Sequence, residues 1–186
     1  MNALNRNEIK KIVKERGGIK LDIGCGNGKH GADWVGMDMQ ALPGVDIIQD
    51  FNKHPWGLPD ESVMTAMCTH VIEHIPKVIM SQVDGELVTR FPLIEFFNEV
   101  WRIMIPDGQF ALVCPHGGSQ GFMQDPTHIS QIDQYTFAYF DPLAFNGELY
   151  QFYRPKPWRI KTLDYSPIGH IEAVLVKRRM DKSYEG

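Results

Sequence analysis

The eight residues LDIGCGNG, residues 21–28, decide how this chain folds. An apolar run over residues 19–23 leads directly into glycines with the spacing G-x-G-x-G, which differs from the G-x-G-x-x-G of dinucleotide sites. Glycines at this place let the backbone turn sharply, and a ligand can come close where no side chain intervenes. The segment therefore predicts a strand that ends in a ligand-binding loop.

Two further apolar runs end at acidic residues. Residues 34–37 lead to Asp38, whose carboxylate is placed to accept hydrogen bonds from both hydroxyls of a ribose. Residues 45–48 end near Asp50, where a carboxylate could accept an adenine amino group and Phe51 could flank the base. Both acidic residues also suit plain turns. Three strand-end features in register nevertheless favour a shared binding edge.

The rest of the chain alternates between apolar runs of strand length and stretches with helical spacing. Helical spacing covers residues 5–16 and about 85–105, where Pro92 breaks the second stretch or starts a new helix. Strand-like runs cover residues 63–69, 110–114, 158–163 and 171–177. The alternation predicts an α/β fold with a mostly parallel sheet and ligands beyond the carboxyl ends of its strands. We expect one domain over residues 1–186, with an N-terminal helix within residues 1–18.

The composition excludes several classes of protein. With 19 basic and 23 acidic residues the net charge is −4, so no basic excess marks a nucleic-acid-binding surface. Cys25, Cys68 and Cys114 form no C-x-x-C pair, which argues against a disulfide framework and a thiolate zinc site. The N-terminus is polar and no segment is apolar enough to span a bilayer, so we expect a cytoplasmic protein without a membrane.

Five segments together resemble the class I S-adenosylmethionine (SAM)-dependent methyltransferases, in particular the type-11 subgroup. LDIGCGNG resembles the first motif of that family, GMD its ribose-binding acidic motif and QDF its adenine-side motif. MCTHVIEHI resembles the segment of strand four that lines the methionine end of the cofactor, and EVWRIMIPDGQFALVCP resembles the helix, turn and strand five that follow. The resemblance implies a Rossmann-like fold whose mostly parallel sheet has seven strands, or fewer, with an antiparallel terminal strand.

The resemblance also implies a cofactor, SAM, with S-adenosylhomocysteine as its product. The positions that match the cofactor motifs are Asp22, Gly24, Cys25, Gly26, Gly28, Asp38, Met39, Asp50, Phe51, Thr69 and His70. One departure from the family is clear, because only ten positions separate Gly28 from Asp38. A crossover helix and its loops do not fit there, so we expect that helix to be reduced to a turn. His30 or the N-terminal helix could supply the missing wall, and the alternative for His30 is a solvated loop histidine.

Residues 70–74 read HVIEH and match the H-x-x-E-H pattern of a family of zinc metallopeptidases. That site requires two histidines on one face of a helix. A strand-like run precedes His70 and Pro76 follows His74, so at best one helical turn forms. No third ligand on a partner helix is evident. We therefore predict no metal site, with Thr69 and His70 facing the cofactor or the substrate and Glu73 capping backbone amides.

The segment after strand five holds the candidate catalytic residues, within a substrate-loop insertion over residues 115–148. His128 is the candidate general base, with Asp125 or His116 orienting it, because a histidine beside a carboxylate is the usual form of a tuned base. The alternative is structural: Asp125 or Thr127 caps a turn and the start of a helix. Aromatic residues over 135–158 complete the core or wall an apolar, planar substrate pocket.

Three functions follow from this reading. The first is a methyltransferase acting on an O or N acceptor, with a small molecule as the expected partner. The second is a SAM-binding structural or regulatory module without catalysis. The third is a nucleic-acid or protein methyltransferase that works with a partner chain, which the acidic net charge disfavours for nucleic acid. The oligomeric state is not evident from the sequence.

Overall fold

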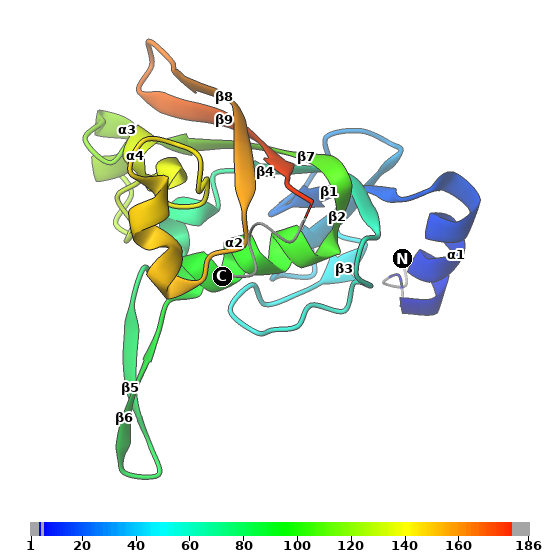
Figure 1. Ribbon diagram of the computed structural model, residues 1–186. Helices are drawn as coiled ribbons and strands as arrows, with labels where there is room; N and C mark the ends of the chain where they lie inside the picture. Colours follow the sequence, from blue (N-terminus) through cyan, green and yellow to red (C-terminus); the bar gives the residue numbers. More distant parts are fainter. Residues whose placement is uncertain (1–3, 5, 180–186) are drawn as a thin grey trace.

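A seven-stranded sheet forms the centre of the protein, in the order β3-β2-β1-β4-β7-β9-β8 (Figure 1). The computed structural model describes Leu4 and residues 6–179. The strands of this sheet are β1 (Ile19–Ile23), β2 (Trp34–Asp38), β3 (Ile47–Ile48), β4 (Val63–Thr69), β7 (Met104–Pro115), β8 (Trp158–Tyr165) and β9 (His170–Lys177). Only β9 runs against the others, because it pairs antiparallel with both β7 and β8. The mostly parallel sheet with one antiparallel strand confirms the predicted fold class.

The principal helix, α2 (Pro92–Ile103), packs its apolar side against the sheet (Figure 1). Pro92 occupies the first helical turn, where its fixed φ favours the helix and its missing amide is not needed. Phe96, Phe97 and Val100 have no exposed surface and lie at helical spacing. Phe97 stacks on Phe140 with ring centroids 4.1 Å apart, so α2 also holds the segment after β7 in the core.

The crossover from β1 to β2 has no helix. Residues 24–33 form turns and bends, which confirms that the ten-residue connection is reduced to a turn. Asp46 ties the crossover down, since its Oδ2 accepts hydrogen bonds from the Gly36 amide and from Lys29 Nζ, both at 2.8 Å. The N-terminal helix α1 (Arg6–Arg16) packs beside β1 through Ile9, which is 2% exposed.

The helical spacing over residues 85–91 was misleading, because these residues lie largely in a hairpin. Strands β5 (Ile79–Val83) and β6 (Glu86–Arg90) pair antiparallel and project away from the rest of the chain (Figure 1). Asp84 and Gly85 join them with φ values of 52° and 85°, as a two-residue hairpin turn requires. Leu87 is 66% exposed, so the apolar residues that suggested a helix face do not pack in the core. Pro92 starts the helix. This confirms one of its two predicted roles, since the other was to break a longer helix.

The segment between β7 and β8 is folded into short helices. These are α3 (Gln120–Met123), α4 (Gln134–Ala138) and the 3-10 helix η2 (Gly147–Tyr153), while η1 (Ile72–His74) follows β4. Ser119 caps α3 and Asp133 caps α4 through side-chain bonds to backbone amides. In the part of the chain that the structure describes, no helix combines the length and the apolar character needed to cross a membrane.

Candidate active site

The candidate site lies where β1 and β4 end. β1 pairs with β2 on one side and with β4 on the other, all parallel, so their carboxyl ends meet at one edge of the sheet. The strand order reverses between β1 and β4, and ligands of open α/β sheets bind at such a switch point. LDIGCGNG, residues 21–28, leads from β1 to this edge.

The glycine loop after β1 needs its glycines for conformation and for space. Gly24 and Gly26 have φ values of 75° and 56°, in the left-handed region that glycine adopts without strain. A Cβ on Gly24 would lie 2.2 Å from Cγ2 of Val71. A Cβ on Gly26 or Gly28 would have no neighbouring atom within 4 Å, so that side of the loop is open to a ligand.

Two predicted carboxylates hold this loop in place. Asp22 is 7% exposed, and its Oδ2 accepts the His30 amide at 2.7 Å. Burial raises the pKa of Asp22, and the hydrogen bond from His30 opposes that rise. Asp38 accepts the Gly26 amide through Oδ2 and the Gln40 amide through Oδ1, each at 3.0 Å. Asp38 is therefore fixed beside the glycine loop through the Gly26 amide. Asp22 is buried and holds the later part of the same connection through the His30 amide.

Cys25 is buried within the loop. Burial raises the pKa of its thiol to about 11, and the charges of Asp22, Asp38 and Asp46 add to the rise. Its Sγ lies 3.6 Å from the carbonyl of Gly44. Cys25 is thus a small packed side chain rather than a nucleophile.

The adenine-side prediction is partly corrected. Phe51 is 6% exposed and packs against Trp56 and Phe96, with centroids 5.7 and 6.2 Å away, so its ring lies in the core and not beside a base. Asp50 Oδ1 accepts the Asn52 amide at 3.0 Å, and this bond lowers the pKa of Asp50. Asp50 therefore stabilises a turn, which was the alternative to its predicted contact with the adenine.

The exposed apolar side chains at this end of β2 and β3 are Met39 and Ile48. Met39 is 50% exposed and Ile48 54% exposed. Ile48 is paired with Asp38 in the sheet register, so Met39 follows directly beside it. Met39 and Ile48 therefore expose apolar surface at this edge, whereas Phe51 is buried.

Thr69 and His70 end β4 at the same edge and are both exposed. The His70 amide continues the ladder to the Val113 carbonyl at 2.9 Å, yet His70 has φ 55°. A non-glycine residue in the left-handed region stores strain, and such residues cluster at functional sites. The strained backbone carries the chain from β4 into the single turn of η1, as the sequence predicted.

The structure brings the HVIEH segment and the loop after β7 together. The Glu73 carbonyl accepts the amides of Ile129 and Ser130, each at 2.9 Å. Glu73 Oε1 lies 3.1 Å from His70 Nδ1 and 3.9 Å from His128 Nε2. The Glu73 side chain has no exposed surface, and its Oε2 has no hydrogen-bond partner among the described residues. The prediction that Glu73 caps backbone amides was wrong, because its carboxylate faces histidines instead.

His74 belongs to the same cluster. Its ring lies 4.7 Å from the His128 ring, and its Nδ1 is 3.2 Å from the carbonyl of Thr127. Ligand atoms of Glu73, His74 and His128 all lie within 4.8 Å of one another. We name these three residues the EHH cluster.

Of the three predicted catalytic residues, His128 and Asp125 are neighbours, whereas His116 has other partners. The His128 side chain is only 8% exposed, and its Nε2 lies 3.7 Å from Asp125 Oδ2. Asp125 also caps a turn, since its Oδ1 accepts the amide and the hydroxyl of Thr127 at 2.8 and 2.6 Å. No helix starts there, because α4 begins only at Gln134.

His116 does not orient His128. Its Nδ1 accepts the Gly118 amide at 3.0 Å, and its ring packs on Tyr165 with centroids 5.3 Å apart. The group that holds His128 is the Phe122 carbonyl, which is 2.9 Å from Nδ1. This corrects the prediction for His116.

Sequence reasoning missed Glu73 and His74 as neighbours of His128. HVIEH contains both residues, but the third metal ligand was expected on a partner helix, as in the peptidases. It lies on a loop much later in the chain, and only the pairing of β4 with β7 brings that loop close.

Comparison with known proteins supports the fold. No family model matches the chain, and no curated protein is similar to it in sequence. Solved structures are similar over nearly the whole length. A SAM-dependent methyltransferase from Archaeoglobus fulgidus has a TM-score of 0.56 and 16% identity, covering 93% of this chain and 95% of that one.

Two more solved structures agree. A putative type 11 methyltransferase from Sulfolobus solfataricus has a TM-score of 0.51 and 17% identity, covering 96% of each chain. A chain from the Haloferax volcanii complex between the Trm112 methyltransferase activator and a putative methyltransferase has a TM-score of 0.55 and 11% identity, covering 93% and 95%. This protein therefore has the class I fold of the SAM-dependent methyltransferases.

Proposed function

We propose that this protein binds SAM at the carboxyl edge of β1, β2 and β4 and transfers its methyl group to an O or N acceptor on a small molecule. The observation that carries the proposal is the glycine loop. It is left-handed at Gly24 and Gly26, open at Gly26 and Gly28, and tied to Asp38 at the switch point of the sheet. A loop of this form lets a ligand lie directly against the main chain.

The residues around the loop fit the parts of this cofactor. Asp38, at the end of β2, is the proposed acceptor for the ribose hydroxyls. Met39 and Ile48 offer apolar contact to the adenine, and Thr69 and His70 lie exposed at the end of β4 for the methionine portion. Phe51 has no part in this arrangement, because it is packed in the core.

The bound cofactor supplies the electrophilic methyl group, and the protein has to hold the acceptor in line with it. Positioning of this kind is worth about 7–11 kcal/mol of barrier in favourable cases. The proton of a hydroxyl or ammonium acceptor needs a receiving group, and His128 Nε2 is the candidate, with Asp125 Oδ2 at 3.7 Å. His128 Nδ1 faces the Phe122 carbonyl, which can only accept, so the Nδ1 atom carries the proton and the lone pair sits on Nε2.

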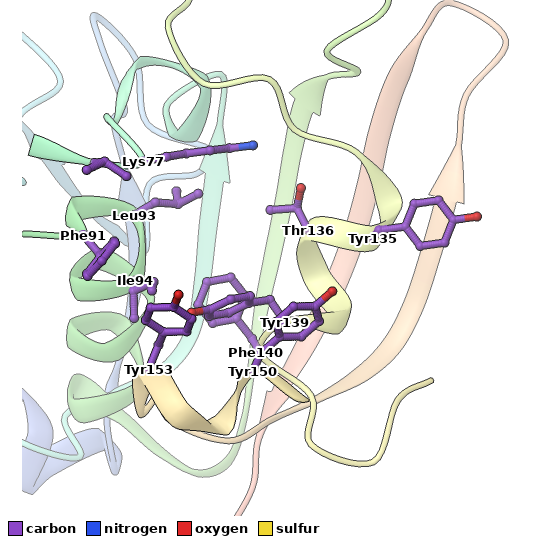
Figure 2. Close-up of a pocket in the computed structure, with 11 residues that line it drawn as sticks. Lys77, Phe91, Leu93, Ile94, Tyr135, Thr136, Tyr139, Phe140, Tyr150 and Tyr153 are labelled. Atoms are coloured by element: carbon purple, nitrogen blue, oxygen red, sulfur yellow. The ribbon is translucent and has the colours of Figure 1, made fainter. Parts of the chain in front are cut away.

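A cavity of about 450 Å³ is large enough for a small, flat acceptor, although neither His128 nor the glycine loop lines it. Figure 2 shows Leu93 and Ile94 of α2 on one wall, with Tyr139 and Phe140 facing them. Tyr150 and Tyr153 close one end, and Tyr139 stacks on Tyr150 at 4.7 Å. Aromatic walls of this kind bind planar apolar groups.

The phenol of Tyr139 stays protonated in this cavity. Burial raises the pKa of Tyr139 to about 12, with Tyr153 and Tyr150 adding to the rise. Tyr139 can therefore donate a hydrogen bond but cannot act as a base. Lys77, on the rim of the cavity, donates to the Gln131 carbonyl and so links the cavity to the loop that carries His128.

Calorimetry with SAM and S-adenosylhomocysteine tests the cofactor assignment. Asp38→Ala should weaken binding about 10- to 100-fold, because a hydrogen bond to a charged group contributes about 1.5–3 kcal/mol. Asp33→Ala is the matched control, since Asp33 is an exposed carboxylate just before the other end of β2 and pairs with Lys20. A folded sample that binds neither ligand would refute the proposal. Equal affinities of the two variants would remove the ribose role of Asp38.

An activator-dependent methyltransferase is the second candidate. The β5–β6 hairpin exposes Met80 (63%), Val83 (51%) and Leu87 (66%), a concentration of apolar surface that favours a protein partner. The Haloferax volcanii neighbour comes from a complex with a methyltransferase activator. A radiolabel-transfer screen over metabolite pools with the isolated chain separates the candidates: SAM binding with turnover supports the first, and SAM binding without turnover supports a partner or a non-catalytic module.

A further inference from the structure

We propose that the EHH cluster, Glu73, His74 and His128, binds one divalent transition-metal ion. The cluster combines a buried carboxylate and two imidazoles, whose ligand atoms lie within 4.8 Å of one another. This proposal replaces the expectation that HVIEH holds no metal. It concerns binding of the ion alone and does not depend on the methyltransferase assignment. An ion held by His128 Nε2 would occupy the lone pair assigned above to the general base, so the two roles exclude each other at this atom.

The hydrogen bonds of the two histidines leave a lone pair free on each ring. His128 Nδ1 donates to the Phe122 carbonyl at 2.9 Å, so its Nε2 is unprotonated in the neutral ring. Thr127 Oγ1 donates to Asp125 at 2.6 Å, so it has no proton to offer His74. His74 Nδ1 therefore donates to the carbonyl or the hydroxyl oxygen of Thr127, each 3.2 Å away, which leaves its Nε2 as an acceptor. Metal-bound histidines nearly always donate their second N–H to a carbonyl or carboxylate in this way.

The Glu73 carboxylate supplies an independent indication of a cation. Its side chain has no exposed surface, and Oε2 has no hydrogen-bond partner within the described part of the chain. His70 Nδ1 lies 3.1 Å from the other oxygen, Oε1, so only one side of the carboxylate is satisfied. A buried polar oxygen without a partner is unfavourable. A metal ion at the cluster would provide a partner for the buried oxygen.

The distances suit a shared ion better than direct hydrogen bonds. His128 Nε2 lies 3.9 Å from Glu73 Oε1 and 3.7 Å from Asp125 Oδ2, which is too long for an N–H···O bond. Ligand atoms bound tetrahedrally at about 2.0–2.2 Å lie about 3.4 Å apart. The ligand atoms, now up to 4.8 Å apart, therefore have to draw together by up to about 1.4 Å to bind one ion. The exposed side chain of His74 is the one with most room to move.

The donor set selects the class of metal. Two imidazoles and one carboxylate suit Zn²⁺, Mn²⁺, Fe²⁺, Co²⁺ or Ni²⁺, whereas Mg²⁺ and Ca²⁺ prefer oxygen ligands. Asp125 lies beside the set, with its Oδ2 3.7 Å from His128 Nε2. Three protein ligands would leave a coordination position for water or another small ligand.

The test is a titration of chelator-treated protein with Co²⁺, followed by its visible absorption, and with Zn²⁺ by calorimetry, both without SAM. We expect one equivalent of Co²⁺ to bind with a tetrahedral or five-coordinate spectrum, and Mg²⁺ not to compete. His74→Ala and Glu73→Gln should weaken binding at least about 10- to 100-fold, the loss seen when even outer partners of a metal site are removed. His30→Ala is the control, because His30 is exposed and packs on Trp34 outside the cluster.

Several outcomes would overturn the proposal. Folded wild-type protein that binds no stoichiometric Co²⁺ or Zn²⁺ would leave His128 as a metal-free base. Binding that survives both His74→Ala and Glu73→Gln would place the ion elsewhere. His74 is exposed and Glu73→Gln preserves shape, so both variants should fold. Calorimetry with SAM on the same samples shows separately whether the proposed function holds.

Discussion

Replacing Gly24 with alanine should destabilise the protein more than the same change at either neighbouring glycine. At φ 75° an alanine is strained by about 1–2 kcal/mol. Its Cβ would also lie 2.2 Å from Val71 Cγ2, and Val71 is 9% exposed and packed. Overpacking of this kind adds about 1–3 kcal/mol. The free energy of unfolding should therefore fall by about 2–5 kcal/mol.

The other two glycines of the loop separate these effects. Gly26 has φ 56° with open space around the place a Cβ would take, so Gly26→Ala should lose only the backbone strain, about 1–2 kcal/mol. Gly28 has neither a left-handed φ nor a close neighbour. Gly28→Ala should be neutral or more stable by about 0.4–1 kcal/mol, because alanine restricts the unfolded chain.

Urea unfolding of the three variants measures this series, and a double-mutant cycle isolates the contact. Val71→Ala removes the methyl group that meets the new Cβ. Combined with Gly24→Ala it should recover about 1–3 kcal/mol relative to the sum of the single changes. If the two changes are additive, or if Gly24→Ala costs no more than Gly26→Ala, the close approach of the loop to Val71 is not present in solution.

Three further changes have defined outcomes. Phe97→Ala should lower the free energy of unfolding by about 3–5 kcal/mol, measured in urea, because the ring is fully buried and stacked on Phe140; a loss under about 1 kcal/mol would contradict that packing. Cys25, with a pKa of about 11, should react with iodoacetamide at pH 8 far more slowly than free cysteine, and only unfolding should restore the rate. Asp22 has a pKa raised by burial, so its ionisation makes stability fall as pH rises through the window above 3.8. Asp22→Asn, whose amide oxygen can still accept from His30, should abolish that fall in acid-range unfolding curves without loss at pH 7.

The sequence predicted the sheet well because its strands carry strong local signals. β1, β2 and β4 are short apolar runs that end in glycine or a polar residue, and buried parallel strands are nearly continuous apolar runs. The β5–β6 hairpin was not predicted, because Leu87 and Val88 fit the helical spacing of the apolar residues in α2. The Asp84–Gly85 turn was the stronger local signal, since that pair is typical of two-residue hairpins.

The candidate site was less predictable, because its residues meet only through tertiary packing. Asp38 and the glycine loop are a short distance apart in the chain and were placed correctly beside each other. Phe51 was assigned to the binding edge from its position alone, and only the presence of Trp56 and Phe96 explains its burial. An aromatic residue after a strand can turn to either side, and the side with more apolar neighbours is favoured.

The junction between β4 and the loop after β7 explains why one short motif can look like two different sites. HVIEH cannot form the helix of a peptidase, because His70 is left-handed and η1 lasts one turn. The same turn exposes the Glu73 carbonyl to the amides of Ile129 and Ser130, and these bonds hold His128 beside the Glu73 side chain. The geometry of the EHH cluster is thus set by backbone hydrogen bonds that exist without any ion. Such preorganisation is what a metal site or a positioned base requires, since neither has to spend binding energy on ordering the loop.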